Sequence, residues 1–176
     1  YIYYGNGSAS DYAVDAEYGR NAVWSDYQLV YHLEETGAGD ANEYVDSTAN
    51  GNDGQGGGGT ESQIPTRTTG KLAGYGQDFL ASDDEYILTT LTADNPAKTI
   101  SAWVQRDIQN SNNAGIISKR GSGDSDLPTQ MGTPANTNNF RALCQDSTSG
   151  YPLADSNGQS LDTWYYVNVV ATGDSG

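Results

Sequence analysis

The sequence is poor in cysteine, methionine and basic residues, and it has no long apolar run. It holds one Cys, one Met, five Pro and 8 Lys and Arg residues against 23 Asp and Glu residues, which gives a net charge of -15. A single cysteine excludes an internal disulfide. No apolar stretch approaches the roughly 18 residues of a membrane-spanning helix, and no signal peptide is visible, so we expect no membrane insertion by this segment. The negative charge opposes binding to nucleic acid or anionic lipid.

Glycine and tyrosine are abundant, at 22 and 13 residues, while 35% of the residues are hydrophobic. Large aromatic side chains compensate for a low aliphatic content, because each buries a large area. The apolar segments are short, rich in β-branched and aromatic residues, and bounded by Gly, Asn, Asp and Ser; they cover 1–4, 27–33, 76–79, 85–91, 98–106, 115–119, 140–145 and 163–172. This pattern predicts an all-β fold, an antiparallel β-sandwich or barrel.

Two of these segments have apolar residues on both faces. In 98–106 Trp103 alternates with Ala102 and Val104, and in 163–172 Trp164 alternates with Tyr165 and Val167. This pattern is typical of central strands in stacked sheets, so we expect both tryptophans in the core or between sheets. Residues 11–24 form the one candidate helix, with a loop over the end of the sheets as the alternative.

The glycine-rich stretch 51–60 has three interpretations. A phosphate-binding loop needs a buried strand before it and a helix after it, and the sequence offers neither. A flexible linker between two domains is the second interpretation. Neither flank is long enough to fold comfortably alone, so we favour the third, a surface loop between two strands of one domain.

Six stretches, in order, carry a resemblance to a known family: "VYHLEE" (30–35), "DSTANGNDG" (46–54), "GKLAGYGQDFLASDDEYI" (70–87), "TISAWVQ" (99–105), "GIISK" (115–119) and "WYYVNVVAT" (164–172). Together they resemble the laminin-G-like, concanavalin A-like jelly-roll domains of prokaryotic surface proteins. "FLASDDEYI" departs from the usual family pattern, because it lacks a glycine and inserts Glu85.

The resemblance implies a domain organisation. Residues 1–6 resemble the last strand of a preceding small β-domain, 7–26 form a connecting segment, and 27–176 form the jelly roll. Family members continue past "WYYVNVVAT" through a turn into another strand. We therefore expect the jelly roll to be incomplete at its C-terminus, with an apolar edge beside 164–172 that residues after Gly176 or a neighbouring chain must cover.

Catalytic residues are not evident. The jelly-roll superfamily includes glycoside hydrolases, whose retaining members need two carboxylates about 5 Å apart, and the E-x-D-x-x-E motif that supplies them is absent. Glu34 and Glu35 alternate across a strand end, and the acidic run 83–85 reads as a turn. His32, the only histidine, is expected in the core or at the rim of a sheet, and Cys144 as a small hydrophobe in a sheet. We predict that the chain is not an enzyme.

Calcium is the one cofactor that the sequence suggests. Hard cations need clustered oxygen ligands, and two glycine-bearing loops offer them: Asp46, Asn50, Asn52 and Asp53 in one, with Asp83 and Asp84 as partners from another. The spacing matches no EF-hand. Hydrogen-bonded turns are the alternative interpretation of the same residues.

Carbohydrate binding needs an exposed aromatic ring beside hydrogen-bonding groups. Trp24, Tyr75 and Tyr151 lie in polar, loop-like surroundings and are the candidates, although packing is the alternative role for each. Asn6 begins an N-glycosylation sequon.

These features favour a non-catalytic extracellular, cell-surface or periplasmic module that recognises carbohydrate or another surface polymer. The alternative is a structural spacer or assembly subunit of a larger structure, such as a filament, a stalk or the ectodomain of an ExbB/TolQ-like protein. That alternative implies self-assembly or strand complementation by a neighbouring chain.

Overall fold

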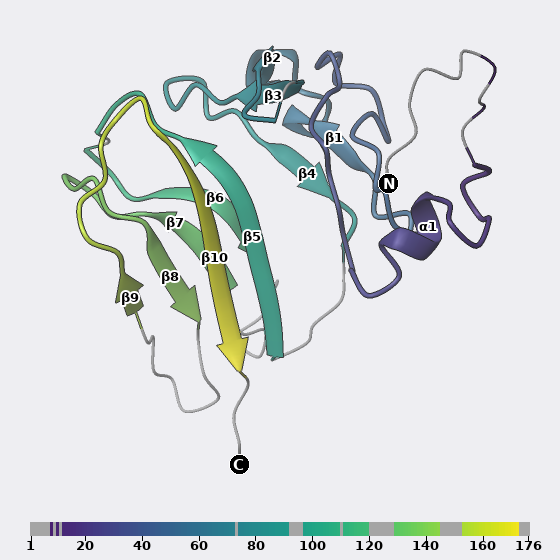
Figure 1. Cartoon of the computed structure of the whole chain (residues 1–176). Helices are drawn as coiled ribbons and strands as arrows, with labels where there is room; N and C mark the ends of the chain where they lie inside the picture. The colour runs from purple at the N-terminus through teal and green to yellow at the C-terminus, as the bar shows by residue number, and fades with distance from the viewer. Residues whose placement is uncertain are drawn as a thin grey trace. The chain divides into compact units, whose positions relative to one another are not determined.

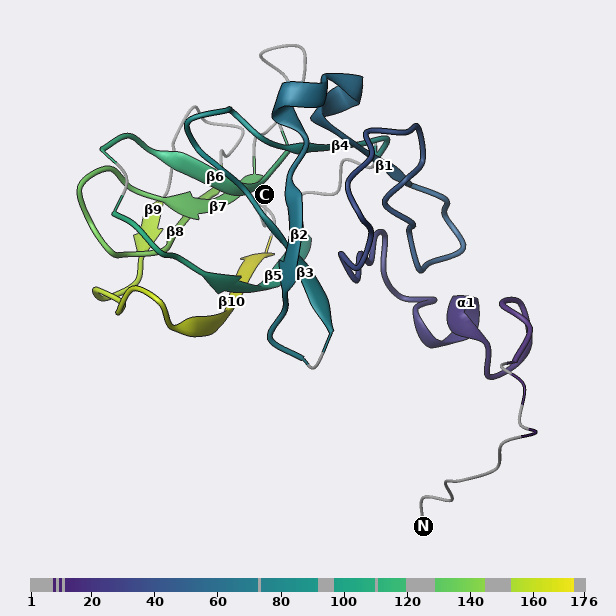
Figure 2. The same ribbon diagram turned by 90° about the horizontal axis from the view of Figure 1, so that it is seen from above.

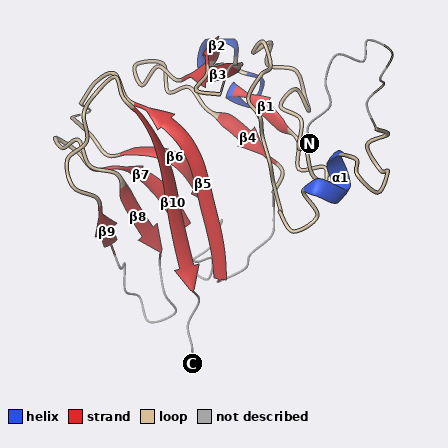
Figure 3. Cartoon of the chain, viewed as in Figure 1, coloured by secondary structure: helices blue, strands red, loops and turns tan. Residues whose placement is uncertain are grey.

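The computed structural model describes residues 8, 10, 12–72, 74–91, 97–109, 111–119, 129–144 and 153–172 (Figure 1). The chain divides into two compact units, Tyr1–Ala93 and Asp94–Gly176. Strands dominate both, and among the described residues helix is limited to one α-helical turn and two 3-10 turns (Figure 3). The expectation of a mostly β chain is therefore confirmed.

The first unit contains one short helix and two small antiparallel pairs. The helix is α1 (Arg20–Val23), which lies within the candidate helical segment 11–24. Strand β1 (Gly54–Gly56) pairs with β4 (Ile87–Thr89), and β2 (Thr66–Thr69) pairs with β3 (Tyr75–Asp78) as a hairpin (Figure 2). The 3-10 turns η1 (Gly57–Gly59) and η2 (Glu61–Gln63) follow β1.

The glycine-rich stretch is not a surface loop, as the sequence suggested, but a strand and a tight turn. Gly54 and Gly56 are buried in β1, and a Cβ atom at Gly54 would lie 2.8 Å from the Ile87 side chain. Glycine is needed here because neighbouring side chains approach the backbone too closely for any other residue. The linker interpretation also fails, because the boundary between the two units lies at Ala93.

Residues 27–33, predicted as a strand, are irregular. Several of their backbone groups bond to side chains, and the Val30 carbonyl accepts from the Ser47 amide at 2.8 Å. The Val30 amide donates to Asp46 Oδ1 at 3.1 Å, and the Leu33 carbonyl accepts from Gln77 Nε2 at 3.1 Å. Leu33 also has a positive φ of 61°, which no strand accommodates.

The second unit contains two antiparallel sheets. Strands β5 (Ala97–Gln105) and β10 (Trp164–Thr172) pair along their full nine residues. The other sheet has the order β6-β7-β8-β9. Its strands are β6 (Ala114–Lys119), β7 (Thr129–Thr133), β8 (Arg141–Cys144) and β9 (Leu153–Asp155). Strands β3, β4, β5, β6, β8 and β10 lie where the sequence predicts them, whereas β1, β2, β7 and β9 were not predicted.

The most deeply buried apolar side chains are few: Tyr44, Met131, Phe140 and Val169. Trp103 is not among them. Its side chain is 41% exposed, so its expected place in the core is wrong, while Trp164 is half-buried. Trp103, Tyr166 and Val170 lie on one face of the β5–β10 pair and are all exposed, so this face is open to solvent.

The jelly roll and the domain boundaries are finer predictions than a β-rich fold. The described strands form separate sheets of two to four strands, and no jelly roll is evident among them. Three sequence predictions, the strand at 1–4, the sequon at Asn6 and the candidate Tyr151, lie outside the described residues. The proposed boundaries at residues 6 and 26 stay predictions.

Candidate functional site

Asp46 is the centre of the loop that the sequence nominated for calcium. It is almost fully buried, and its two carboxylate oxygens accept four hydrogen bonds. Oδ1 accepts from the amides of Val30 and Thr48 at 3.1 and 2.9 Å. Oδ2 accepts from Thr48 Oγ1 at 2.8 Å and from the Asn52 amide at 3.0 Å. A buried carboxylate with this many donors serves as the hub of a turn.

The neighbouring residues of the loop also bond within the protein. Asp53 Oδ1 accepts from the Asp46 amide at 2.7 Å. Asn50 Nδ2 donates to the carbonyls of Tyr27 and Gln28, and Asn52 Nδ2 donates to the Gln28 carbonyl at 2.8 Å. These bonds fasten the irregular segment before residue 33 to the loop 46–53.

Asp46 does not fit a calcium ligand in this arrangement, because an ion would have to displace donors from both oxygens. Asp83 and Asp84 are exposed in a turn, where Asp83 Oδ1 accepts from Ser82 Oγ at 2.9 Å. Within the described ranges, no group of three or more His, Cys, Asp or Glu side chains is placed to hold a metal ion. The structure thus favours hydrogen-bonded turns at Asp46, and calcium binding by the remaining oxygens stays a prediction.

The electrostatics of this region follow from burial and hydrogen bonding. Burial opposes ionisation of Asp46, but the bonds from Thr48, Asn52 and Val30 outweigh it and lower its pKa below the ordinary value. Burial raises the pKa of Tyr44 to about 12, and the nearby carboxylates of Glu43, Glu35 and Glu85 add to the effect. Both groups therefore hold a single charge state at neutral pH and act structurally.

The carbohydrate-binding candidates differ in what surrounds them. Trp24 is half-buried, with its ring centroid 5.3 Å from that of Tyr27 and 6.0 Å from that of His32. Tyr75 is exposed, but the guanidinium of Arg67 lies 4.2 Å from its ring centroid. One face of Tyr75 is thus occupied by a cation–π contact, and Trp24 is engaged in packing. His32 itself is exposed and lies in the irregular segment 27–33, so it is neither in the core nor in a described strand.

A larger aromatic surface lies on the β5–β10 pair, and the sequence analysis did not identify it. Trp103 and Tyr166 are direct cross-strand partners with ring centroids 5.4 Å apart, and Tyr166 is 58% exposed. Paired residues and every second neighbour share a face of the sheet. We call this the aromatic face; its described side chains are Thr99, Ser101, Trp103, Gln105, Trp164, Tyr166, Asn168 and Val170.

Polar groups flank the rings on the aromatic face. Ser101 and Asn168 are also direct cross-strand partners, two residues along each strand from the Trp103–Tyr166 pair. Both are exposed, and within the part of the chain that the structure describes neither side chain makes a hydrogen bond. The face therefore offers flat rings beside an unused hydroxyl and an unused amide, and it runs for about 20 Å along the strands.

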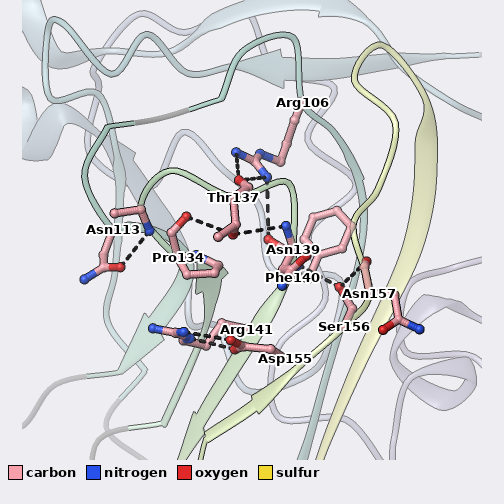
Figure 4. Close-up of polar contacts among 11 residues, drawn as sticks. Arg106, Asn113, Pro134, Thr137, Asn139, Phe140, Arg141, Asp155, Ser156 and Asn157 are labelled. Carbon is pink, nitrogen blue, oxygen red and sulfur yellow. Dashed lines mark hydrogen bonds and ion pairs between the residues drawn. The ribbon is translucent and has the colours of Figure 1, made fainter.

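The opposite face of the pair fixes it to the rest of the second unit. Val169 is buried there, and the ring of Tyr165 meets that of Phe140 at a centroid distance of 5.8 Å. At the end of β5, Arg106 donates to the carbonyls of Thr137 and Asn139 (Figure 4). The strands are thus held from behind, so their aromatic face has a defined shape.

The aromatic face was missed because its signal is not local. Both strands have apolar residues on each of their two faces. From the sequence alone, an exposed face of this kind looks the same as a buried one. What identifies the site is the register that places Trp103 opposite Tyr166, together with the exposure of both side chains. Trp103 and Tyr166 are 63 positions apart in the sequence, so only the tertiary structure reveals that they pair.

The acidic clusters considered for catalysis occupy turns. Glu35 Oε1 accepts from the Val45 amide at 3.1 Å, and Glu85 Oε2 accepts from the Leu80 amide at 2.6 Å. Asp84 has a left-handed backbone, with φ of 53°. Carboxylates that bond to backbone amides in this way stabilise the local backbone, which is the structural alternative to a catalytic role.

Comparison with known proteins gives no further guide: no protein-family model, curated protein or solved structure shows a significant match to this chain. None of the helices in the described part is both long and apolar enough for a transmembrane span.

Proposed function

We propose that the chain is a non-catalytic recognition module that binds carbohydrate through the aromatic face of β5 and β10. The observation that carries the proposal is the exposed cross-strand pair of Trp103 and Tyr166 beside Ser101 and Asn168. The C–H face of a pyranose stacks on an aromatic ring, and its hydroxyls need hydrogen-bonding partners. Rings and polar groups on a rigid strand pair meet both needs.

The wider expectations form part of the same proposal. The antiparallel β5–β10 pair and the four-stranded sheet support an assignment to the concanavalin A-like β-sandwiches, in which the two sheets would form the layers of a jelly roll. The resemblance of the six sequence stretches to surface proteins supports an extracellular, cell-surface or periplasmic location.

Affinity electrophoresis against a panel of soluble polysaccharides tests the function. We expect at least one polysaccharide to retard the wild-type protein, and Tyr166→Ala to remove the retardation while circular dichroism stays unchanged. Tyr18→Ala is the matched control, because Tyr18 is exposed to a similar degree in the other unit. Uniform absence of retardation for folded wild-type protein would overturn the proposal.

A second candidate function, assembly into a larger structure, is favoured by the edges of the same pair. Among the described strands, β5 and β10 pair only with each other, so no described strand continues the sheet beyond either outer edge. Such edges accept a further strand from another chain. Light scattering after size-exclusion chromatography over a concentration series tests this, and a monomer at every concentration would contradict it.

A further inference from the structure

The aromatic face carries no charge, although the chain as a whole is strongly acidic. Its described side chains are hydroxyl, amide, aromatic and aliphatic groups only. The chain around it has 23 acidic and 8 basic residues and a net charge of -15. Among the described side chains of this face, a ligand meets no cation that would compensate a carboxylate or sulfate, and it lies in the negative potential of the whole molecule.

Resting on the proposed function, we infer that the ligand class is an uncharged polysaccharide chain, and that acidic glycans are excluded. Binding a polyanion at an uncharged face would cost desolvation of its charges without an ion pair in return. A neutral glycan incurs neither that desolvation nor repulsion by the acidic surface. Its hydroxyls find the Ser101 hydroxyl and the Asn168 amide, which are direct cross-strand partners.

The arrangement of groups also fits an extended chain better than a single sugar. Three aromatic side chains, Trp164, Tyr166 and Trp103, lie toward one end of the face. The polar pair follows, and Thr99 and Val170 lie beyond it. A face of about 20 Å is longer than one sugar ring, so several rings of a chain can contact it together.

Isothermal titration with two sets of soluble glycans tests the inference. The neutral set is a mixed-linkage glucan, a xyloglucan and a galactomannan; the acidic set is a polygalacturonate, an alginate and a hyaluronan. We expect binding within the neutral set only, with a dissociation constant that stays the same between 0.05 and 0.5 M NaCl. Salt independence follows because no ion pair forms.

Two variants locate the site. Tyr166→Ala removes a stacking ring, and we expect an affinity loss of about tenfold, equivalent to about 1.4 kcal/mol. Asn168→Asp keeps the shape but adds a charge and removes the amide donor, and we expect a loss of similar size. Tyr18→Ala again serves as the control, with unchanged affinity. Because Asn168 is exposed in an edge strand, its variant remains informative if Tyr166→Ala does not fold.

The outcomes separate the two proposals. Binding of acidic glycans, or an affinity that falls with salt, would overturn the ligand class and leave carbohydrate recognition in place. Neutral binding that neither variant weakens would overturn the aromatic face as the site. No binding by either set would overturn both the function and its ligand class.

Discussion

A single buried carboxylate organises the loop 46–53. Asp46 accepts from two segments at once, the amide of Val30 and the donors of Thr48 and Asn52. Because these donors favour the ionised form, the pKa of Asp46 is lower in the folded than in the unfolded chain. Its contribution to stability is therefore fully present above the unfolded pKa, about 3.9, and is lost as the pH falls through the lower folded pKa.

Asp46→Asn tests this assignment. The amide cannot accept from all four donors, so we expect the first unit to lose about 1–3 kcal/mol of stability at pH 7. The difference from the wild type should shrink as the pH falls from about 3.9 through the lower folded pKa, below which the wild-type carboxylate is itself protonated. Hydrogen exchange of peptides covering 44–57, measured across this pH range, reports the local stability. A difference that is constant with pH would contradict the role of the charge.

Gly51 and Gly57 both have a positive φ, but only Gly57 is crowded by neighbouring atoms. Substituting each by alanine therefore separates the cost of backbone strain from the cost of crowding. Gly57 and Gly51 have positive φ of 56° and 67°. A Cβ atom at Gly57 would lie 2.9 Å from the Gln63 backbone carbon, whereas at Gly51 it meets nothing within 4 Å. The left-handed conformation costs each alanine variant about 1–2 kcal/mol.

We expect Gly57→Ala to destabilise the first unit by about 1–3 kcal/mol more than Gly51→Ala, since only the former crowds the backbone. Hydrogen exchange of the segment 54–64 in both variants measures the difference. Equal effects would mean that the turn at η1 relaxes to admit the methyl group.

Among the elements, the strands of the second unit were the most predictable. Segments 98–106 and 163–172 correspond closely to β5 and β10, because nine-residue runs of branched and aromatic side chains fit a pleated sheet. The strand at 27–33 was wrong, although its composition is similar. Its backbone is bound by Asp46 and Gln77, and no local pattern reveals partners that lie so far along the sequence.

The candidate sites show the same limit. Asp46, Asn50, Asn52 and Asp53 do form one cluster, as their spacing predicted, but the structure uses Asp46 as a hydrogen-bond hub. The aromatic face was not predicted, because its exposure depends on which face of the β5–β10 pair other elements cover. Composition predicts strands well, yet it does not say which of their faces stays uncovered.

Arg106 joins the end of β5 to the turn before β8 without a carboxylate partner among its described contacts. Its guanidinium donates to the carbonyls of Ile108, Thr137 and Asn139, and burial lowers its pKa, although not enough for a guanidinium to lose its charge at neutral pH (Figure 4). Hydrogen bonds from a charged group contribute about 1.5–3 kcal/mol, and a planar fork reaches several carbonyls at once.

We expect Arg106→Lys to destabilise the second unit by about 1.5–3 kcal/mol, because lysine keeps the charge but not the fork. Urea unfolding in a Trp24→Phe background measures this, since the remaining tryptophans, Trp103 and Trp164, both lie in the second unit. Arg141→Lys is the control. Arg141 forms an exposed pair with Asp155 at 2.7 Å, and exposed pairs contribute little. An equal loss of stability in both variants would contradict this role of the Arg106 guanidinium.

At the scale of the whole molecule, charge sets both the choice of ligand and the response to salt. A net charge of -15 on 176 residues places many carboxylates within each other's field. The Debye length falls from about 30 Å at 0.01 M salt to about 8 Å at 0.15 M, so ordinary salt screens most of this repulsion. The folded chain is more compact than the unfolded chain and experiences the repulsion more strongly.

We therefore expect the thermal midpoint to rise as NaCl increases from 0.01 to 0.3 M, and choline chloride to give the same curve, because screening depends on ionic strength alone. Calcium provides the decisive control. With ionic strength held constant, 1 mM CaCl2 and EDTA separate screening from calcium binding by oxygens other than those of Asp46, which already accept hydrogen bonds from the protein. A rise specific to calcium would show that the loop 46–53 binds the ion after all. A midpoint that stays constant as NaCl and choline chloride increase would show that the acidic residues lie too far apart to repel one another. The exclusion of acidic glycans would then depend on the aromatic face alone.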